Sequence, residues 1–407
     1  MPERFGRYWL HEQIGHGGMA EIFRATVGPD PESYAFDLAL KRMHAPLEKD
    51  RSRVEMFFTE ADVAKFLHHP NLVRVYEAGL IEGRAYIAME SIWGHDLSKL
   101  IAQLRRRRLR FPSDLAIFVT LQLLRALDYV HRAKAPGGVE MNLVHRDVTP
   151  SNIYVTFGGE VKLGDFGVAH ISFLEPHESS GTVKGKVGYM PPEVISGDPV
   201  DQAVDVWGAA VTLYEMLTTR GVYGEVSDED LIAGIEPPPV TPLHKVNSDI
   251  ELALSKILSR ALHRNPKKRP RNAVQFYRHL KLYLRDTGIV VDSSALARFV
   301  WEITGAGASP MGPKPKADTG QFAMPDYQAP LEQSPTQRFE AVSRRRRRLP
   351  FLIVGGLVVA AIVVVLVRGS PPPQTGETLL PPSPIEQPDE TPPPSGRGGA
   401  GFDFTGA

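Results

Sequence analysis

The chain contains no cysteine among its 407 residues. Disulfide bonds and thiolate metal sites are therefore excluded, and the composition suits a reducing compartment. Net charge is also absent, since 47 Lys and Arg side chains balance 47 Asp and Glu side chains. Without an excess of positive charge, we expect no nucleic-acid partner held by a general electrostatic field.

The first ten residues also lack an apolar stretch. Met1–Leu10 is polar and has no apolar stretch, so we expect no cleavable signal peptide there. A long apolar run stands instead at Leu349–Val367, and it contains no charged residue. Its length is that of a helix that crosses the hydrocarbon core of a bilayer, and the alternative is a buried core helix.

The charges beside this apolar run favour the membrane interpretation. Arg344–Arg348 is a block of five arginines immediately before it, whereas only Arg368 follows it closely. The positive-inside rule then predicts that residues 1–343 are cytoplasmic and residues 369–407 lie outside. The expected location is the cell (inner) membrane, in a single-pass protein that contacts membrane lipid through one helix.

Two segments in the middle of the chain carry a distinctive set of polar residues. His145–Asn152 (HRDVTPSN) places a carboxylate and, five residues later, a carboxamide on one loop. Lys162–Gly167 (KLGDFG) adds a second carboxylate beside a glycine turn. For either segment alone, the alternative is a hairpin with solvated polar turn residues. The strands predicted around them are Asn142–Val144, Ile153–Thr156 and Val161–Leu163.

This order of Asp, Asn and Asp resembles the catalytic core of Hanks-type protein kinases, in particular the eukaryotic-like Ser/Thr kinases of bacteria. The resemblance implies an α+β fold of two lobes, a small β-rich N-terminal lobe and a larger, mainly helical C-terminal lobe. It implies ATP and Mg²⁺ as cofactors, with Asp147 as the catalytic base and with Asn152 and Asp165 as the metal ligands.

A glycine turn near the N-terminus fits the phosphate-binding loop of this family. Glycine lets the backbone approach a phosphate closely and present N–H groups to it, although such a turn alone fits many tight hairpins. Ala20 stands where the family usually has its third glycine. By resemblance, the nucleotide-binding residues of this region are Ile14, Gly15, Gly17, Gly18 and Ala39.

Lys41 ends an apolar strand and resembles the lysine that contacts the α- and β-phosphates. A lysine in this position is otherwise an ordinary edge residue. Glu60, in a helix predicted from about Arg51 to Leu67, matches the acidic partner that orients this lysine. Arg42 and Glu55 are then interpreted as surface charges.

The segment after the strands predicted at 72–78 and 85–89 resembles the hinge between the lobes. By resemblance, the backbones of Glu90 and Ile92 bond the adenine ring, Met89 is the gatekeeper and Asp96 reaches the ribose. Asp96 fits equally well as the N-cap of a helix that starts near Leu97.

A basic run follows that helix. Arg105–Arg110 is interpreted as a solvated basic face, and the alternative is contact with anionic lipid headgroups. Ser113 is then expected to cap a long apolar helix. Farther along, Asp205 matches the residue that ties a helix to the catalytic loop, and Arg269 matches the partner of Glu193.

A polar stretch at 170–184 fits an activation segment, and residues 185–193 resemble the loop that docks a protein substrate. Arg146 precedes the catalytic aspartate and fits a receptor for a phosphate on this segment. The candidate phosphorylation sites are Ser172, Ser179, Ser180 and Thr182.

Thr149 departs from the family pattern, which has a lysine there. Lys186 stands where the family has a threonine, so the two residue types are exchanged. Because the two positions face each other in this family, the resemblance leads us to expect that Lys186 delivers its ammonium to the transferring phosphate. The alternative is a solvated lysine of the activation segment.

The predicted organisation has five parts. They are a kinase domain at 8–286, a short helical extension at 287–304, a flexible juxtamembrane linker at 305–348 that ends in the arginine run, a transmembrane helix at 349–367, and a Pro-rich disordered extracytoplasmic tail at 368–407. Gly356 and Ala360 form a small-residue face in the predicted span that would permit a homodimer, and the alternative is that lipid simply tolerates small residues.

The expected function is ATP-dependent phosphorylation of Ser and Thr hydroxyls on proteins, including autophosphorylation, in membrane-associated signalling. One alternative is a pseudokinase scaffold that binds nucleotide without turnover, for which the missing lysine at Thr149 is the argument. Another is a small-molecule kinase on a related fold. The residues that resemble the protein-docking apparatus argue against the latter.

Overall fold

The computed structural model describes residues 1–31, 36–135, 137–166, 187–224, 226–233 and 236–305. Contacts divide the chain into two units, residues 1–339 and 340–407, and all described residues lie in the first. Within these described segments, no helix combines the length and the apolar character needed to cross a membrane. The predicted linker, span and tail lie outside the described residues.

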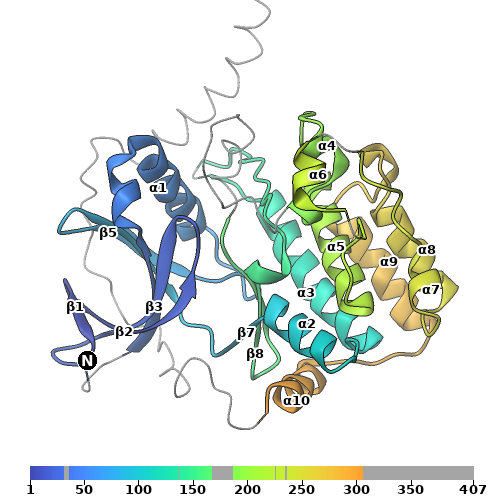
Figure 1. The fold of residues 1–407 in the computed structure, drawn as a ribbon, viewed down its shortest axis with the longest axis horizontal. Coiled ribbons are helices and arrows are strands. Elements are labelled where there is room, and N and C mark those ends of the chain that lie inside the picture. The colour runs from blue at the N-terminus through green and yellow to red at the C-terminus, as the bar shows by residue number, and fades with distance from the viewer. Residues whose placement is uncertain (32–35, 136, 167–186, 225, 234–235, 306–407) are drawn as a thin grey trace, which may run out of the picture. The chain divides into compact units, whose positions relative to one another are not determined.

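The N-terminal lobe is a six-stranded antiparallel sheet in the order β1-β2-β3-β4-β6-β5, and helix α1 packs against β5 (Figure 1). The elements are β1 (Glu3–Phe5), β2 (Tyr8–His16), β3 (Ala20–Val27), β4 (Phe36–Met43), α1 (Arg51–Lys65), β5 (Val75–Ile81) and β6 (Arg84–Glu90), with a 3₁₀ turn at Ala45–Lys49. The predicted helix is confirmed, and Asp50 caps it by accepting hydrogen bonds from the N–H groups of Ser52 and Arg53.

Alternation along β4 decides where Lys41 lies. Leu38 and Leu40 belong to the apolar cluster on one face of the sheet, with Tyr8 and Tyr86. Met43 belongs to the other cluster, with Phe57 and Ala61 of α1. Because successive side chains of a strand point to opposite faces, Lys41 shares the face of Met43 and is directed toward α1.

The C-terminal lobe is mainly helical and includes a small antiparallel sheet in the order β7-β8-β9. Its elements are β7 (Gly94–Asp96), α2 (Leu97–Arg106), α3 (Ser113–His131), β8 (Ile153–Thr156), β9 (Val161–Leu163), α4 (Pro192–Ile195), α5 (Ala203–Thr218), α6 (Asp228–Ile232), α7 (Leu243–Val246), α8 (Leu252–Ala261), α9 (Ala273–Asp286) and α10 (Ser293–Thr304), with 3₁₀ turns at Pro150–Asn152, Val187–Tyr189 and Pro266–Lys268. Every residue of α5 is buried, and α3 packs against both α5 and α9.

Some local predictions were wrong. Asn142–Val144 is not a strand, because Asn142 has a φ of 47°, which interrupts an extended chain. The strand predicted at 72–78 begins later, since β5 spans Val75–Ile81. Helix α3 begins at Ser113 rather than after it, so Pro112 is the N-cap and the Ser113 side chain does not cap the helix.

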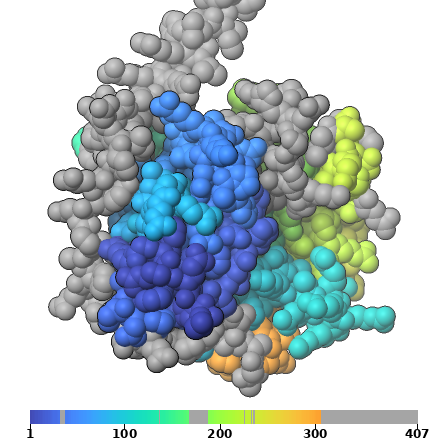
Figure 2. Space-filling view, turned by 60° about the vertical axis from the view of Figure 1, so that its left-hand side comes forward, coloured from blue at the N-terminus to red at the C-terminus, as the bar shows by residue number. Residues whose placement is uncertain are grey.

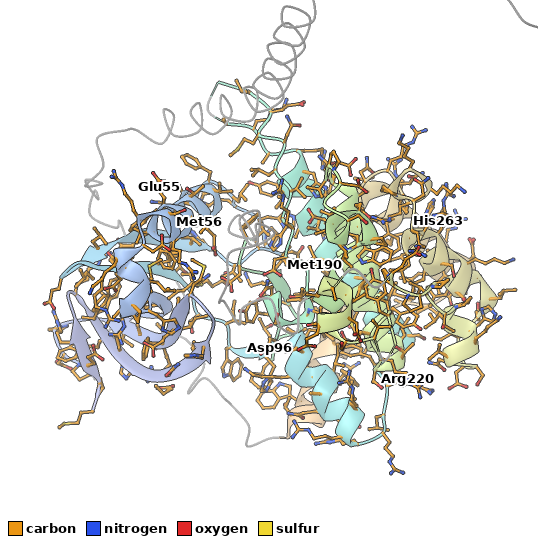
Figure 3. All side chains as sticks on the ribbon, turned by 45° about the horizontal axis from the view of Figure 1, so that its top comes forward. Glu55, Met56, Asp96, Met190, Arg220 and His263 are labelled. Carbon is orange, nitrogen blue, oxygen red and sulfur yellow. The ribbon has the colours of Figure 1, made fainter. Side chains whose placement is uncertain are left out.

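The prediction for Arg42 was also wrong, while that for Glu55 is confirmed. Glu55 is exposed on α1, as Figure 3 shows. Arg42 is only 7% exposed, and its guanidinium lies 4.7 Å from the Phe23 ring centre and 2.8 Å from a carboxylate oxygen of Glu3. Strand β1 covers this arginine, and the sequence carried no signal for so short a strand.

Candidate active site

Three charged side chains from separate elements meet at one point. The ammonium of Lys41, on β4, donates to Glu60 of α1 at 3.0 Å and to Asp165, two residues after β9, at 2.9 Å. Lys41 and Glu60 have side-chain exposures of only 13% and 14%, so water screens their attraction weakly. The structure therefore brings together the lysine and the two acids that the sequence predicted as one site.

Burial and neighbouring charges have opposite effects on the pKa values of Lys41 and Glu60. Burial alone would lower the pKa of Lys41, but the carboxylates of Asp165 and Glu60 outweigh it and raise this pKa above its ordinary value. Burial is also the main reason that the pKa of Glu60 is raised, and the Lys41 ammonium offsets it only in part. The lysine thus stays cationic in the physiological pH range, as a phosphate-binding group must.

Asp147 and Asn152 lie on the loop between α3 and β8 and are both buried. The amide nitrogen of Asn152 donates to the Asp147 carbonyl at 2.9 Å and to its carboxylate Oδ2 at 2.7 Å. The Gly164 N–H also donates to the Asn152 carbonyl at 2.9 Å, which joins this loop to the residue before Asp165. Because the Asn152 amide nitrogen is committed to Asp147, Oδ1 is the atom that Asn152 can offer to a cation.

The carboxylate of Asp205, on α5, fixes the backbone of the loop that carries Asp147. Its carboxylate accepts the N–H groups of His145 at 2.8 Å and Arg146 at 2.7 Å, and it pairs with His131 Nε2 at 2.7 Å. Arg146 has a φ of 68°, a conformation that side chains other than glycine rarely adopt. Two charge-assisted hydrogen bonds to adjacent N–H groups offset this strain.

Close approach of α5 to the loop requires Gly208. A Cβ atom at Gly208 would lie 2.8 Å from the Val148 carbonyl oxygen, which is too close for any other residue.

Burial of Asp205 would raise its pKa, but the His131 hydrogen bond and nearby charges outweigh burial, so this pKa is lowered. Asp205 therefore remains an anion, and its predicted position under the catalytic loop is what the structure has.

A ring contact links the loop that carries Asp147 to the segment that carries Asp165. The rings of His145 and Phe166 lie 4.7 Å apart between centres, and both side chains are buried. Burial lowers the pKa of His145, and its Nδ1 accepts the Asp147 N–H at 3.3 Å, which requires a neutral ring. Asp165 itself has a φ of 49°, so the Phe166 contact and the Lys41 ion pair hold it in a strained conformation.

The predicted hinge residues lie at the end of β6 and in the chain that follows. The Glu90 N–H donates to the Arg74 carbonyl at 2.8 Å, and its carboxylate pairs with Lys162 at 2.8 Å. The N–H of Glu90 is thus committed to the protein. Ile92 is buried, and Met89 packs with the apolar cluster that faces α1.

Asp96 is the N-cap of α2 and lies at the start of this helix in Figure 3. Its Oδ1 accepts the Lys99 N–H at 2.9 Å, and its Oδ2 pairs with the Lys99 ammonium at 2.9 Å. The capping interpretation is confirmed. The carboxylate is held by its own helix, so a ribose hydroxyl would share it with Lys99.

The glycine turn connects β2 and β3 as predicted. Gly17 donates its N–H to the Ala20 carbonyl at 2.9 Å, and its own carbonyl bonds His44 Nε2 at 2.8 Å. Gly17 and Gly18 are exposed, whereas Gly15 lies in β2 against Ile22. Ile14 is on the same strand, and Ala39 is buried on β4.

A model of the protein kinase domain matches residues 8–280. The chain belongs to the protein kinase family. The predicted two-lobed kinase fold is thereby confirmed, and the structure extends it to about residue 300. Members of this family in general use ATP with Mg²⁺.

Curated relatives are similar over most of the kinase domain. Tyrosine-protein kinase MasK of Myxococcus xanthus is 33% identical over 318 residues, which cover 78% of this chain and 47% of that protein. Serine/threonine-protein kinase PksC of Streptomyces coelicolor is 31% identical over 271 residues, covering 65% and 46%. The chain spans about half the length of these relatives. Ser/Thr protein kinases are therefore among the homologues of this member of the protein kinase family.

Solved structures are similar as well. The crystal structure of the Mycobacterium tuberculosis PknI kinase domain is 25% identical, with a TM-score of 0.52, and covers 69% of this chain and 98% of that one. The match spans almost all of the solved kinase domain, so it supports the two-lobed architecture.

The apparatus expected to dock a protein substrate is assembled in the kinase domain. Arg269 donates to Glu193 through two parallel hydrogen bonds of 2.6 and 2.7 Å, and its guanidinium lies 4.7 Å from the Trp207 ring centre. The Tyr189 hydroxyl donates to Glu215 at 2.6 Å, and Glu215 also pairs with Arg105 at 3.1 Å. Arg105 is therefore part of this network and not simply a solvated base of the arginine run.

Arg269→Ala is expected to lower the free energy of unfolding by about 3–5 kcal/mol, because it leaves the Glu193 charge buried without its partner. Denaturant unfolding followed by tryptophan fluorescence measures the change. The matched control is Arg285→Ala, whose pair with Asp286 is exposed and should change stability by no more than about 0.5 kcal/mol. Equal effects of the two substitutions would contradict the role of the Arg269 pair.

Some functional residues escaped the sequence analysis. His131 and Lys162 bond Asp205 and Glu90 over separations of 74 and 72 residues. No local motif marks His131, which lies inside an ordinary helix pattern, and the segment Lys162–Gly167 carries no signal that Lys162 pairs with Glu90. Thr149 was noted, and its Oγ1 lies 2.9 Å from the Ser151 hydroxyl, with the residue 4% exposed. Lys186 and the candidate phosphorylation sites lie outside the described residues.

A cavity of about 610 Å³ lies away from this site, at the start of α3 and the end of α5. Arg105, Arg108, Arg110 and Arg220 are on its wall, and none of the predicted nucleotide-binding residues lines it. Figure 3 labels Arg220 at this part of the C-terminal lobe. The cavity is therefore separate from the candidate active site.

Proposed function

We propose that this chain transfers the γ-phosphoryl group of ATP to Ser and Thr hydroxyls of proteins, including its own. The observation that carries this proposal is the position of Lys41, held at 3.0 Å from Glu60 and 2.9 Å from Asp165. A phosphate-binding cation is thereby fixed beside a carboxylate that suits Mg²⁺. Such preorganisation is the main way in which a protein accelerates phosphoryl transfer.

Asp147 acts as the base in this proposal. Its carboxylate accepts the proton of the attacking hydroxyl as that oxygen bonds the γ-phosphorus. The bond from the γ-phosphorus to the β–γ bridging oxygen breaks, and ADP leaves. The hydrogen bond from Asn152 to Asp147 Oδ2 orients the carboxylate for this proton transfer.

Asn152 and Asp165 fit the metal that the family uses. Both offer hard oxygen atoms, which Mg²⁺ prefers, and Mg²⁺ commonly takes only one or two protein ligands together with phosphates and water. Among the described residues there is no cluster of three or more His, Asp or Glu side chains that would form a larger protein cage. When bound, Mg²⁺ neutralises charge on the phosphates.

The nucleotide is proposed to lie between the glycine turn and the hinge. Gly15, Gly17 and Gly18 present backbone to the phosphates, Ile14 and Ala39 contact the base, and the family pattern assigns Glu90 and Ile92 to adenine hydrogen bonds. Asp96 is proposed to bond the ribose. A pseudokinase scaffold remains the alternative, and nucleotide binding without turnover would favour it.

Tyrosine is a second candidate substrate. Thr149 supplies a hydroxyl, already paired with Ser151, at the position where Ser/Thr kinases usually have a lysine. MasK, 33% identical to this chain, is named a tyrosine kinase. Acid hydrolysis of labelled product separates the outcomes: phosphoserine and phosphothreonine support the proposal, and phosphotyrosine alone would replace it. In either case we propose that Lys186 supplies the cation at the transferring phosphate.

We also propose that residues 349–367 anchor the kinase in the cell membrane with the kinase domain in the cytoplasm. The support is the uncharged apolar run with five arginines before it. The predicted result is that the full chain sediments with membranes and resists high-salt extraction, whereas deletion of 349–367 releases it. A deletion variant that sediments as the wild type does would contradict the anchor.

Two further proposals concern regulation. Phosphorylation at one of the activation-segment hydroxyls is proposed to raise activity through Arg146, and Gly356 and Ala360 are proposed to let two spans associate, which would favour reaction between copies. Both rest on the sequence patterns alone.

A further inference from the structure

Helix α10 (Ser293–Thr304) lies beyond the region that the family model matches, which ends at residue 280. It is nevertheless a well-defined element. Asp292 caps it by accepting the Ala295 N–H at 2.9 Å, and Gly305, with a φ of 83°, ends it. Leu296 and Val300 have no exposed surface, so the helix buries its apolar face in the main core.

The surface that α10 covers is the region next to the hinge. The helix contacts α2 and β8, and Figures 1 and 2 show it in orange beside the cyan segment that includes α2. Phe299 packs on Phe111 with ring centres 4.6 Å apart. A Cβ atom at Gly159 would lie 1.9 Å from the Ser293 carbonyl oxygen, so the turn between β8 and β9 must have glycine to let α10 approach.

Trp301 connects α10 to the hinge through both hydrogen bonds and ring contacts. Its indole Nε1 donates to the Phe157 carbonyl at 3.2 Å, and the Phe157 N–H donates to the Trp93 carbonyl at 3.0 Å. The Trp301 ring centre lies 4.5 Å from that of Phe157 and 5.8 Å from that of Trp93. Trp93 directly follows Ile92, one of the residues assigned to adenine.

We propose that Trp301 is a positioning residue for the nucleotide and that α10 belongs to the functional kinase unit. This inference rests on the proposed assignment of Ile92 to the nucleotide site. A hinge is a short segment between two lobes and must be ordered when ATP binds. Contacts that order it beforehand reduce the entropic cost of binding. Trp301 supplies such contacts from outside the site, since it touches Trp93 and Phe157 rather than the nucleotide.

The test compares ATP binding by the full chain in detergent for Trp301→Ala, Trp301→Phe and the wild type. Loss of two ring contacts and one hydrogen bond is expected to raise the Kd and the KM for ATP about fivefold to tenfold, with kcat changed by less than about twofold. Trp301→Phe keeps an aromatic ring beside Phe157 and Trp93 but loses the N–H donor and part of the ring surface, so its Kd should lie between those of Trp301→Ala and the wild type. Isothermal titration calorimetry gives Kd without requiring turnover.

Trp9→Ala is the matched control. Trp9 is also a half-buried indole that donates to a carbonyl, that of Gly28 at 3.3 Å, but it lies on β2 away from the hinge. The Trp9→Ala substitution should lower the melting temperature without changing the Kd for ATP. The proposal is overturned if Trp301→Ala binds ATP as the wild type does and only its melting temperature falls.

The result also separates this inference from the proposed function. A wild-type chain that binds ATP without transferring phosphate would refute the proposed activity, yet the Kd comparison would still decide the role of Trp301. A wild-type chain that binds no ATP would overturn both.

Discussion

Asp147→Asn is expected to lower kcat for phosphoryl transfer by about 10²–10⁴-fold, the usual contribution of a positioned acid–base group. The substitution keeps the size of the side chain and removes its ability to accept the proton. The Asp147 N–H still bonds His145 Nδ1, and the bond from Asn152 to the Asp147 carbonyl is unaffected, so the loop should keep its conformation. The measurement is the initial rate with saturating ATP and Mg²⁺.

The matched control for this prediction is Asp286→Asn. Asp286 is 63% exposed and pairs with its neighbour Arg285, so the change removes the same carboxylate far from the site. It should leave kcat unchanged, and thermal unfolding should show all three proteins folded. Near-normal turnover in Asp147→Asn would end the assignment of Asp147 as the base.

Lys41→Met is expected to lower kcat by about 10²–10³-fold, as for other preorganised electrostatic groups. The substitution removes the cation for the phosphates and leaves Glu60 and Asp165, which Lys41 now bridges, without their common partner. Two carboxylates left together at low exposure repel each other, so the loop that carries Asp165 should also lose its fixed position. Rates at saturating ATP separate this effect from weaker binding.

Lys65→Met provides the comparison for Lys41→Met. Lys65 ends α1 and pairs with Asp62 at 3.5 Å on the surface of that helix. Its loss should change the rate by less than about twofold, since surface ion pairs contribute little. A Lys41→Met chain that keeps more than half of the wild-type rate would contradict the role given to Lys41.

Sequence reasoning succeeded where the chemistry is carried by short ordered motifs. Asp147 and Asn152 share one loop, and Asp165 follows a short strand, so their proximity depends on local spacing. Lys41 and Glu60 came from strand and helix patterns, and strand alternation with the packing of α1 brought them together. In the structure Lys41 pairs with Glu60 and Asp165, and Asn152 bonds Asp147. The hydrogen bond from the Gly164 N–H to the Asn152 carbonyl joins the two sets through the backbone.

Prediction from the sequence was less successful for contacts that join segments far apart in the chain. The sequence left two roles open for Asp96, the N-cap of α2 and a ligand of the ribose. A carboxylate directly before a helix fits both roles. Burial of Arg42 depends on the packing of β1, and the contact of Trp301 with Phe157 joins residues 144 positions apart. Such contacts follow from how the elements pack, which no local pattern encodes.

The boundary of the kinase domain is a related case. The prediction ended it at residue 286 and treated 287–304 as an extension. Helix α10 buries Leu296 and Val300 completely in the core of the C-terminal lobe, so this segment is structurally part of the domain. The sequence predicted a short helix in this segment, but a helix pattern does not specify the surface that the helix covers.

The most direct test of the central claim is transfer of labelled γ-phosphate from ATP to protein by the wild-type full chain, with nucleotide binding measured on the same sample. The account predicts incorporation that requires Mg²⁺, that appears on Ser or Thr after acid hydrolysis, and that is lost in Asp147→Asn. ATP binding with no incorporation into any protein, the chain itself included, would contradict it and identify a pseudokinase.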